Sequence, residues 1–364
     1  MKYCINCILP DSRPNIIIMQ DGKCSACHSH HNKKKINWGK RKILFEKIIS
    51  KIKKKKKIYD CLIPVSGGKD STWQVLKVLS YGLNPLTFSY KPILRTKIGQ
   101  TNLDNLKKIG VHHIDFTVNE NAEKKFLKKV FFKFGAVALP MHMAMWNMSY
   151  NLAKSFSIPY IIWGENSANE YGGSERDNKL KNLDKKWIKK YGINFNTTAK
   201  NWVGKDLSEK ELAPFIKLKS NNNKFKPISI FLGDYFKWDP LETFNIAKKF
   251  GFKQNRNGPK TGVYNYADID DDLISIHHFL KVYKFGFSRD YDNLSLEIRN
   301  KRMSREKAVK LAKKRGFKIP YKDINKFCKL IGISQKKFFE TCEKFRNKKI
   351  WYKKKKWQLK FKLV

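Results

Sequence analysis

Residues 58–71 read IYDCLIPVSGGKDS, and this stretch decides the fold of the 364-residue chain. Residues 58–65 form a short apolar run that predicts a β-strand, and the Ser66-Gly67-Gly68 segment after it predicts a turn. Residues 70–81 then place apolar side chains at helical spacing and stop before Gly82, which predicts a helix. The stretch therefore predicts a strand, a glycine-rich loop and a helix in direct succession.

The same alternation continues after this unit. Short apolar runs predict further strands, each followed or preceded by a segment of helical pattern, and the connections are short. Such a βαβαβ order predicts an α/β fold with a Rossmann-like parallel sheet covered by helices on both faces. The predicted strands lie at 85–90, 113–118 and 159–163, and the predicted helices at 98–109 and 141–156.

The remainder of the chain predicts other kinds of structure. Residues 170–226 are polar and predict loops and short elements over the mouth of the site. Helical patterns then return, so the C-terminal third is expected to be mostly helical, with Ser304 as an N-cap. These helices are predicted at 243–250, 270–285, 304–315 and 334–345.

We expect four regions. Residues 1–35 carry four cysteines, and residues 36–57 form a basic linker helix with a predicted apolar stripe of Ile43, Leu44, Ile48 and Ile52. The sheet domain covers 58–226, and a mostly helical substrate or partner region covers 227–364.

The loop Ser66-Gly67-Gly68-Lys69-Asp70-Ser71 has the residues of a phosphate site. Glycines allow a tight turn and a close ligand, and backbone N–H groups at a helix N-terminus attract anions. Lys69 adds a positive charge, and the Asp70 carboxylate is a ligand type suited to Mg²⁺. The spacing is not that of a Walker loop. The alternative is an ordinary serine and glycine turn.

Cysteine spacing predicts a metal site. Cys4 and Cys7 form one Cys-x-x-Cys pair, and Cys24 and Cys27 form a second pair sixteen residues later. Two such pairs are typical of a structural zinc knuckle with four thiolate ligands. A rubredoxin-type iron site, free thiols, and a contribution from His28, His30 or His31 are the alternatives.

The formal net charge of +46 invites a nucleic-acid interpretation. The excess is mostly lysine and is spread over the chain, together with abundant Asn, Ile and Phe, so we attribute it to codon usage and consider nucleic acid an unlikely partner. The lysine runs at 53–57 and 353–356 are expected to be a linker and a solvated C-terminal helix. No apolar run reaches the length of a membrane span and the N-terminus lacks a signal-peptide pattern, which predicts a cytoplasmic protein.

The phosphate loop resembles the SGGxDS signature of the PP-loop ATP pyrophosphatases. This resemblance implies that ATP is cleaved between the α- and β-phosphates, that a substrate oxygen takes AMP, and that pyrophosphate leaves. We accordingly assign these residues to the ATP site: Ser66, Gly67, Gly68, Lys69, Asp70, Ser71, Phe88, Tyr90 and Gly164.

Two classes of PP-loop enzyme compete. Those that thiolate tRNA need a sulfur-carrying cysteine, but Cys61 lies on the predicted buried strand, and Cys328 and Cys342 lie far away on predicted helices. Those that form amides need ammonia, and no cysteine here lies in a glutaminase-type nucleophile elbow. A tRNA thiolation enzyme remains the alternative.

The chain as a whole resembles the N-acetyl sugar amidotransferases of the O-antigen and pseudaminic-acid type. The resemblance rests on the two cysteine pairs, on residues 65–71 and on several later motifs. These motifs are Ile162-Trp163-Gly164-Glu165-Asn166, Glu170-Tyr171-Gly172-Gly173, Asp234-Tyr235 with Trp238-Asp239, residues 284–290, Glu297-Ile298-Arg299 and Met303-Ser304-Arg305-Glu306.

The resemblance implies conversion of a sugar acetamido group to an acetamidino group in surface-glycan biosynthesis, with ATP, Mg²⁺ and a structural Zn²⁺. It also implies a separate glutaminase of the histidine-biosynthesis type, with its cyclase-like subunit, as the ammonia source. A homodimer is compatible with the sequence. The identity of the sugar and of its carrier (UDP, CMP or lipid) stays open.

Further site residues are assigned on this basis. Lys69, Asp70 and Glu165 are the expected catalytic residues, with Asp70 on Mg²⁺, and Glu165 follows a predicted strand at the edge where open α/β sheets bind ligands. Arg289, expected in a turn between helices, is a candidate for bidentate contact with a phosphate or carboxylate. Its alternative is an ion pair with Asp290 or Asp292. The expected substrate residues are Asn166, Tyr171, Gly172, Arg289 and Asp290, whereas the stripe of Met141, Met143, Met145 and Met148 is expected to pack in the core.

Overall fold

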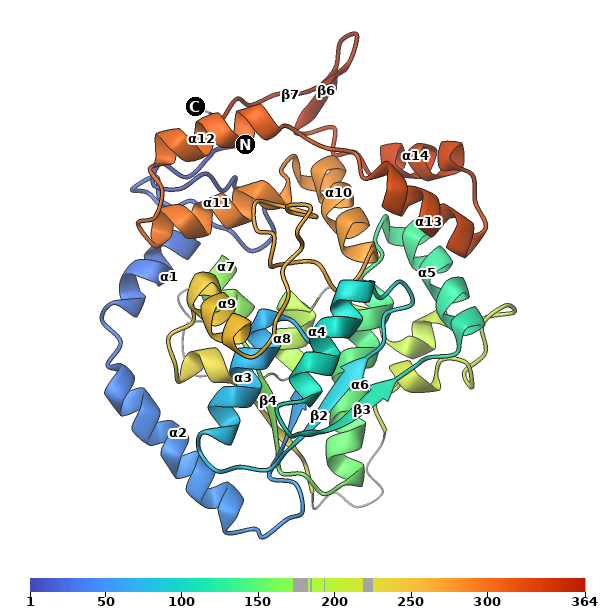
Figure 1. Ribbon diagram of the computed structural model, residues 1–364. Helices are drawn as coiled ribbons and strands as arrows, with labels where there is room; N and C mark the ends of the chain where they lie inside the picture. Colours follow the sequence, from blue (N-terminus) through green and yellow to red (C-terminus); the bar gives the residue numbers. More distant parts are fainter. Residues whose placement is uncertain (173–182, 184, 193, 219–224, 364) are drawn as a thin grey trace.

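The computed structural model describes residues 1–172, 183, 185–192, 194–218 and 225–363 (Figure 1). A five-stranded sheet with the order β3-β2-β1-β4-β5 lies at its centre, and every neighbouring pair in it is parallel. In register, Leu62 pairs with Leu86 on one side and with Ile161 on the other. The strands are β1 (Cys61–Pro64), β2 (Pro85–Tyr90), β3 (His112–Phe116), β4 (Tyr160–Trp163) and β5 (Ile228–Phe231).

Helices cover both faces of the sheet. One face packs against α2 (Trp38–Lys53), α3 (Lys69–Leu79) and α4 (Lys97–Lys107), and the other against α5 (Glu120–Phe134) and α6 (Leu139–Ser155). Successive strand residues alternate between the two cores, because side chains of a strand point to opposite faces. The predicted fold class, a Rossmann-like parallel sheet, is therefore confirmed.

Two elements of this unit were not predicted. The strand β5 is the short apolar run Ile228-Ser229-Ile230-Phe231, which comes directly after a polar stretch. The helix α5 buries Phe126, Leu127 and Val130, a helical spacing that the sequence does contain. The first strand is also shorter than expected, since Ile58 is 84% exposed and pairing starts at Cys61.

The linker helix α2 is present, but only half of its predicted apolar stripe is confirmed, because Ile52 is buried and Ile48 packs against the same core. Ile43 and Leu44 are exposed, and the buried residues are Phe45, Ile49 and Ile52. The aromatic side chain of Phe45 packs against Tyr81 and Tyr235, so one large ring decides which face of the helix turns inward.

Short elements connect the sheet to the C-terminal region. They are α7 (Ser167–Tyr171), α8 (Lys185–Tyr191), the 3₁₀ turns Ala199–Trp202, Ala213–Phe215 and Leu232–Asp234, and the helix α9 (Pro240–Lys249). The loops and short elements predicted for 170–226 are found where the structure describes this stretch. Residues 173–182, 184, 193 and 219–224 lie outside the described residues.

The C-terminal region is mostly helical, as predicted, and Figure 1 shows it above the edge at which the strands end. Ser304 caps its helix by accepting a hydrogen bond from the Lys307 N–H, also as predicted. The lysine run at 353–356 is not helical, because it forms the turn of a hairpin between two short strands. These elements are α10 (Leu273–Phe285), α11 (Arg289–Arg299), α12 (Arg305–Arg315), α13 (Tyr321–Ile331), α14 (Gln335–Lys344), β6 (Trp351–Lys353) and β7 (Trp357–Leu359).

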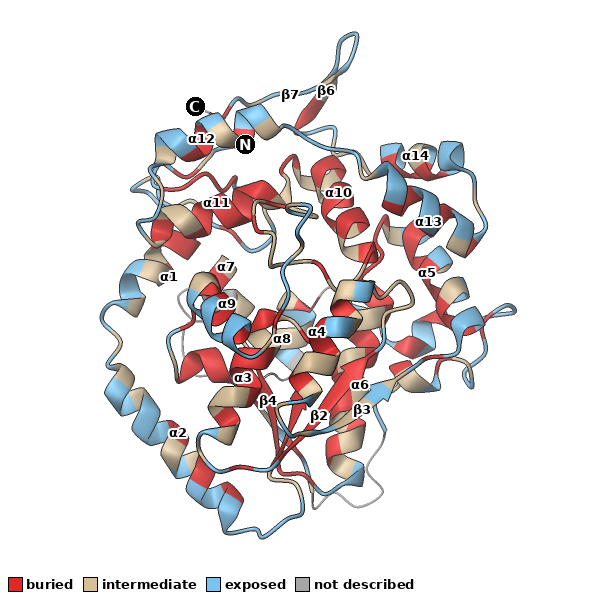
Figure 2. Cartoon of the chain, in the orientation of Figure 1, coloured by how far each residue is buried: buried red, intermediate tan, exposed pale blue. Residues whose placement is uncertain are grey.

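The N-terminal segment packs on this region. Its cysteines, Ile8 and Leu9 share one buried cluster with Phe287 and Leu294, and Figure 2 shows α11 almost fully buried beneath it. The segment contains a helix that was not predicted, α1 (Ser25–Lys33), which carries the last of the four cysteines.

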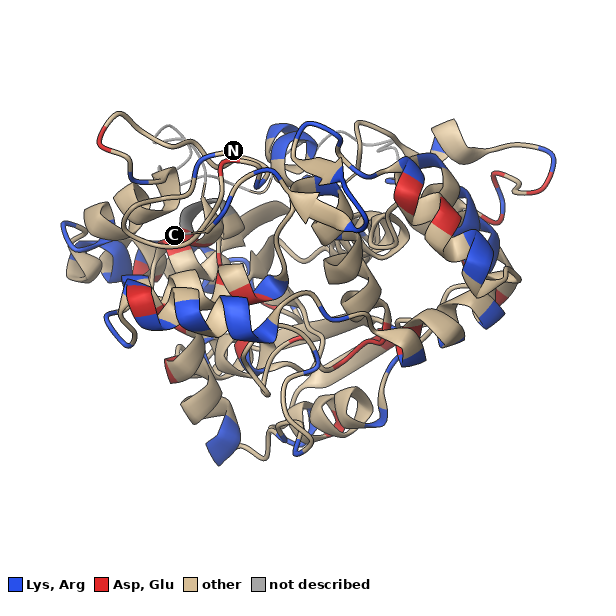
Figure 3. Ribbon diagram, turned by 90° about the horizontal axis from the view of Figure 1, so that it is seen from above, with Lys and Arg blue, Asp and Glu red and all other residues tan. Residues whose placement is uncertain are grey.

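Lysine and arginine residues lie on many helices and loops of the molecule, and acidic residues are fewer (Figure 3). Among the described residues, no helix has both the length and the apolar character that crossing a bilayer requires.

Candidate functional site

The loop 66–71 joins the end of β1 to the start of α3, as predicted. Within it, the Ser66 N–H donates to the Ser71 hydroxyl over 3.0 Å, and the Gly68 N–H donates to the Ser66 hydroxyl over 3.3 Å. Gly68 is the N-cap of α3 and no side chain caps the helix there. The first N–H groups of α3 are consequently available to an anion.

Gly67 is required by the local geometry. Its φ is +82°, and a Cβ at this position would lie 2.5 Å from the backbone nitrogen of Leu103 in α4. Any side chain would therefore both strain the backbone and collide with the next helix. The glycine therefore allows the loop to turn tightly against α4.

Asp70 is held by residues of the C-terminal region. Its Oδ1 accepts a 2.9 Å hydrogen bond from the indole N–H of Trp238 and a 2.8 Å bond from the hydroxyl of Thr243. Its Oδ2 pairs with the ammonium group of Lys69, which is buried and lies 5.6 Å from the centre of the Trp238 ring. The loop is thus locked to α9 and the segment before it.

Two cavities meet at the loop. The smaller, of about 200 Å³, lies over Gly67, Gly68 and Lys69, and the larger, of about 800 Å³, extends past Ser71 between the sheet and the C-terminal helices. Both are lined by Ser66, Asp70, Glu165, Tyr171, Asp268, Asp270 and Arg289. An elongated space of this kind suits a nucleotide at the loop with a second ligand beside it.

Carboxylates gather where the cavities meet. Burial, followed by the negative charge of Asp70, raises the pKa of Glu165 to about 7. Burial also raises the pKa of Asp270. For Asp268 burial acts in the same direction, but the neighbouring Arg289 outweighs it and holds the pKa well below the ordinary value. Such shifted carboxylates in a cavity are typical of functional sites.

These carboxylates could bind Mg²⁺ only together with phosphate oxygens of a bound nucleotide. Among the described residues, the four cysteines form the one group of three or more metal-binding side chains whose ligand atoms lie within 4.8 Å of one another. Mg²⁺ in nucleotide sites is commonly held by one or two carboxylates together with phosphate oxygens, and Asp70 and Glu165 suffice for that arrangement.

The structure brings most of the predicted site residues together. All six loop residues, Glu165, Tyr171 and Arg289 line at least one cavity, and Phe88, Tyr90, Gly164 and Gly172 line the larger one. Asn166 lines neither cavity and donates to Asp234 over 3.3 Å. Asp290 also lies outside both cavities and forms an ion pair with Arg315.

The expected turn at Arg289 is wrong, because Arg289 is the first residue of α11. Its side chain forms an ion pair of 3.0 Å with Asp268 and lies 3.7 Å from Asp292. The methionine stripe packs in the core as expected, with Met143 buried and Met141, Met145 and Met148 packed against the same cluster, and Met141 and Met145 also line the larger cavity.

Several residues of the site were not predicted from the sequence. Asp268 and Asp270 come from an irregular segment before α10, and Trp238 and Thr243 belong to the region expected to bind substrate or a partner. An Asp-rich stretch, Asp268-Ile269-Asp270-Asp271-Asp272, was visible in the sequence, but only the fold places it beside the phosphate loop.

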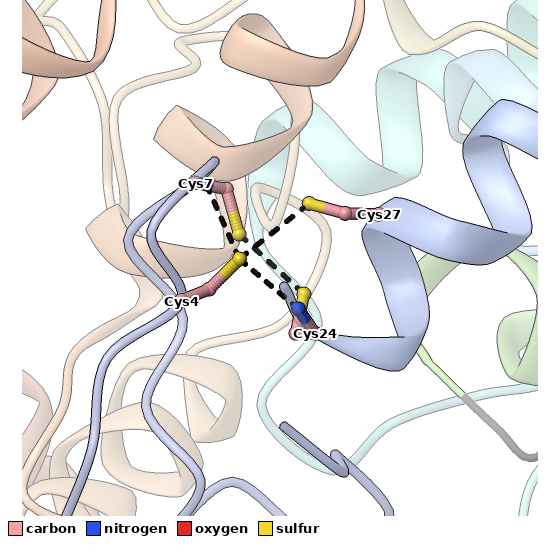
Figure 4. Close-up of side chains that lie close together, drawn as sticks. All are labelled: Cys4, Cys7, Cys24 and Cys27. Atoms are coloured by element: carbon pink, nitrogen blue, oxygen red, sulfur yellow. Dashed lines mark hydrogen bonds between the residues drawn. The ribbon is translucent and has the colours of Figure 1, made fainter. Parts of the chain in front are cut away.

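The four cysteines at the N-terminus have the geometry of a zinc site (Figure 4). The sulfur atoms of Cys4 and Cys27 lie 3.8 Å apart, and those of Cys7 and Cys24 lie 3.6 Å apart. Thiolates about 2.3 Å from a tetrahedral zinc ion lie about 3.8 Å from one another. The arrangement therefore fits Zn²⁺ bound by four thiolates.

Hydrogen-bond donors around the sulfur atoms also support a zinc site. The backbone N–H groups of Cys7 and Cys24 lie 3.4 and 3.1 Å from the sulfur of Cys4, and the Asn6 amide lies 3.2 Å from that of Cys27. Arg299 is buried nearby, and the cysteines raise its pKa although burial alone lowers it. These groups would offset the negative charge of four thiolates.

The other three cysteines lie away from both cavities. Cys61 and Cys342 are fully buried and Cys328 is 3% exposed. None of the three lines a cavity, so the site has no thiol in a position to carry sulfur.

Comparison with known proteins identifies the C-terminal part of the chain. Residues 233–363, about a third of the sequence, match the family model described as "LPS biosynthesis protein WbpG-like, C-terminal domain". Over this region the match confirms the resemblance to proteins of surface-glycan biosynthesis. No curated protein sequence matches the chain.

Two solved structures overlap the chain at low similarity. One is a predicted subunit of a tRNA methyltransferase from Methanocaldococcus jannaschii, with 15% identity, a TM-score of 0.28, and coverage of 64% of this chain and 90% of that one. The other is NMN synthetase from Francisella tularensis, with 14% identity, a TM-score of 0.28, and coverage of 59% and 94%. Similarity at this level carries no weight for the function of the present chain.

Proposed function

We propose that the protein is an ATP-dependent, AMP-forming amidotransferase of lipopolysaccharide or related surface-glycan biosynthesis. It converts the acetamido group of an N-acetylated sugar into an acetamidino group with ammonia as the second substrate. The single observation that carries the proposal is the placement of the SGGKDS loop against a C-terminal region that matches an LPS-biosynthesis domain, with Asp70 bonded to Trp238.

The loop supports the first half of the reaction. The uncapped N-terminus of α3 and the loop N–H groups bind the β- and γ-phosphates, and Lys69 stabilises the charge that develops on pyrophosphate as it leaves. Asp70 and Glu165 would hold a Mg²⁺ ion, which would polarise the phosphates as a Lewis acid. The α-phosphate is then open to attack from the larger cavity.

The chemistry of the acetamido group accounts for the second half of the reaction. An amide oxygen is a poor leaving group, whereas an oxygen bonded to AMP is a good one. The amide oxygen attacks the α-phosphate, the bond between the α- and β-phosphates breaks, and the sugar nitrogen releases its proton to water to give the neutral imidate. The imidate carbon then accepts ammonia, a proton passes from the new nitrogen to the sugar nitrogen, and the bond from carbon to the AMP oxygen breaks.

Ammonia is proposed to come from a separate glutaminase with a cyclase-like partner. The seven cysteines of this chain are either in the knuckle or buried away from both cavities, so no cysteine nucleophile for glutamine hydrolysis lies at the site. The same observation argues against tRNA thiolation, which would need a thiol near the adenylated base.

The proposal is tested by supplying purified enzyme with ATP, Mg²⁺ and a panel of N-acetylated nucleotide sugars. We expect product with isotope-labelled ammonium chloride but not with labelled glutamine alone, and we expect the label to appear in an acetamidino group. A matched panel of sugars that carry a hydroxyl in place of the acetamido group should give no turnover. Turnover of those hydroxyl sugars, or glutamine use by the chain alone, would contradict the proposal.

A further inference from the structure

The cysteine knuckle reaches the site through Arg13. This residue lies between the two cysteine pairs, in a segment anchored by the buried side chains of Leu9 and Ile16. Its side chain is only 16% exposed, and its Nε donates a 2.8 Å hydrogen bond to Asp292. Arg13 and the two residues after it line the larger cavity.

Asp292 is the point at which several cations meet. It is 1% exposed, and besides Arg13 it accepts a 2.7 Å hydrogen bond from Lys281 and lies 3.7 Å from Arg289. Although burial acts to raise the pKa of Asp292, Lys281 and Arg13 hold it far below its ordinary value. Removal of Arg13 would take one charge-assisted hydrogen bond from this buried carboxylate and leave it with Lys281 and Arg289.

Two of the same cations, Arg13 and Arg289, lie near the aromatic ring of Tyr171. The guanidinium carbon of Arg13 is 5.8 Å from the centre of the Tyr171 ring, and that of Arg289 is 5.6 Å from it. Distances of this size are within the range of cation–π attraction. Tyr171 and Arg289 line both cavities, and Arg13 contacts a ring and a carboxylate that also lie against Arg289, whose own hydrogen bond goes to Asp268.

The knuckle itself is fixed to the helix that carries Arg289. The Ile8 N–H donates to the Ser295 hydroxyl over 3.3 Å, and the Ser12 hydroxyl donates to the Phe285 carbonyl over 2.6 Å. Gly172, next to Tyr171, approaches the knuckle so closely that a Cβ would lie 2.4 Å from Ile16. These contacts set the position of the Arg13 backbone relative to α11 and α7.

We propose that Arg13 is a positioning residue of the site, and that the knuckle is built to supply it. Through Asp292 and Tyr171, Arg13 holds Arg289 in the cavity wall beside the phosphate loop. The knuckle therefore contributes to the wall of the larger cavity as well as to the stability of the fold. The kinetic part of this inference rests on the proposed function, whereas the structural part does not.

The test compares Arg13→Ala and Arg13→Lys with Lys23→Ala as a matched control. Lys23 is a half-exposed cation of the same knuckle, pairs with Asp21 and lines neither cavity. Metal content and melting temperature are measured first, so that only variants with an intact knuckle are compared. The Lys variant keeps the charge but not the planar contact with Tyr171, and should fall between the wild type and Arg13→Ala.

Amide hydrogen exchange gives a readout that does not depend on knowing the sugar. We expect Arg13→Ala to speed exchange in α7 and in the first half of α11 by roughly tenfold, the effect of losing one charged hydrogen bond on local opening. The Lys23→Ala variant should exchange like the wild type. Unchanged exchange in Arg13→Ala would overturn the proposal.

Kinetics give the second readout. Arg13→Ala should raise the KM for the sugar by roughly tenfold or more while the affinity for ATP stays the same. Equal losses for both substrates would show general damage and would also overturn the proposal. If no sugar is turned over even by the wild type, the proposed function fails, and hydrogen exchange alone still decides the role of Arg13.

Discussion

The indole N–H of Trp238 donates a 2.9 Å hydrogen bond to the Oδ1 of Asp70, which lies 168 positions earlier in the chain. The same oxygen accepts a bond from Thr243 of α9. The phosphate loop is thus completed by the region that matches the LPS-biosynthesis domain. ATP use and substrate choice are expected to depend on the two regions together.

The Trp238→Phe variant tests this dependence. It removes one hydrogen bond to the Asp70 carboxylate while keeping most of the ring, and it should lower kcat by about tenfold to a hundredfold, since bonds to charged groups contribute about 1.5–3 kcal/mol. Steady-state pyrophosphate release measures the effect. Trp351→Phe is the matched control, because it loses a 3.2 Å indole bond to the Val282 carbonyl far from the loop and should leave kcat unchanged.

Glu165→Gln should change the pH dependence of stability. In the folded protein burial raises the pKa of Glu165 to about 7, above its ordinary value of 4.5. The folded state therefore keeps a proton that the unfolded chain releases, and stability falls as pH rises from about 4.5 to about 7. The variant cannot ionise, so chemical denaturation should show it more stable than wild type by about 1–3 kcal/mol near pH 8 and nearly equal near pH 5. A deficit of stability at the higher pH would contradict the buried position of this carboxyl.

The knuckle should contain one tightly bound Zn²⁺ per chain. The four sulfur positions fit a tetrahedral zinc ion, and the cluster is buried against α11. Elemental analysis of freshly purified protein measures the metal, and a preparation without zinc or iron would contradict the assignment. Cys24→Ser should lower the melting temperature and solubility before it changes the affinity for ATP, because the cysteines lie outside the phosphate loop.

A triple change of Cys61, Cys328 and Cys342 to Ala should preserve turnover in variants that remain folded. All three thiols are buried and none lines a cavity, so each contributes packing and not chemistry. Each change should cost on the order of 1 kcal/mol of stability. Thiolated tRNA formed by the wild type and lost in this variant would favour the alternative function.

The sheet and the loop could be predicted because their signals are local. An apolar run that ends in Ser66-Gly67-Gly68 determines strand, turn and helix within a few residues, and the paired cysteines have a spacing that few other sites share. Strand β5 was missed because its apolar run is only four residues long and follows a polar stretch.

The rest of the site depends on contacts between distant segments. Nothing near Asp268 or Trp238 in the sequence shows that either lies beside the loop, because α9 and the segment before α10 are brought there only by the fold. Likewise, Arg13 looked like part of a metal-binding segment, and its approach to Asp292 depends on how the knuckle packs on α11. Sequence reasoning thus identified the loop and the cysteine cluster, but not the residues that join the regions.

The path of the acetamido oxygen tests the central claim most directly. A substrate with heavy oxygen in its acetamido group is converted with ATP, Mg²⁺ and ammonium, and the nucleotide products are separated and weighed by mass spectrometry. The account predicts AMP that carries the heavy oxygen in its phosphate, together with unlabelled pyrophosphate. ADP and inorganic phosphate as products, or AMP without the label, would contradict it.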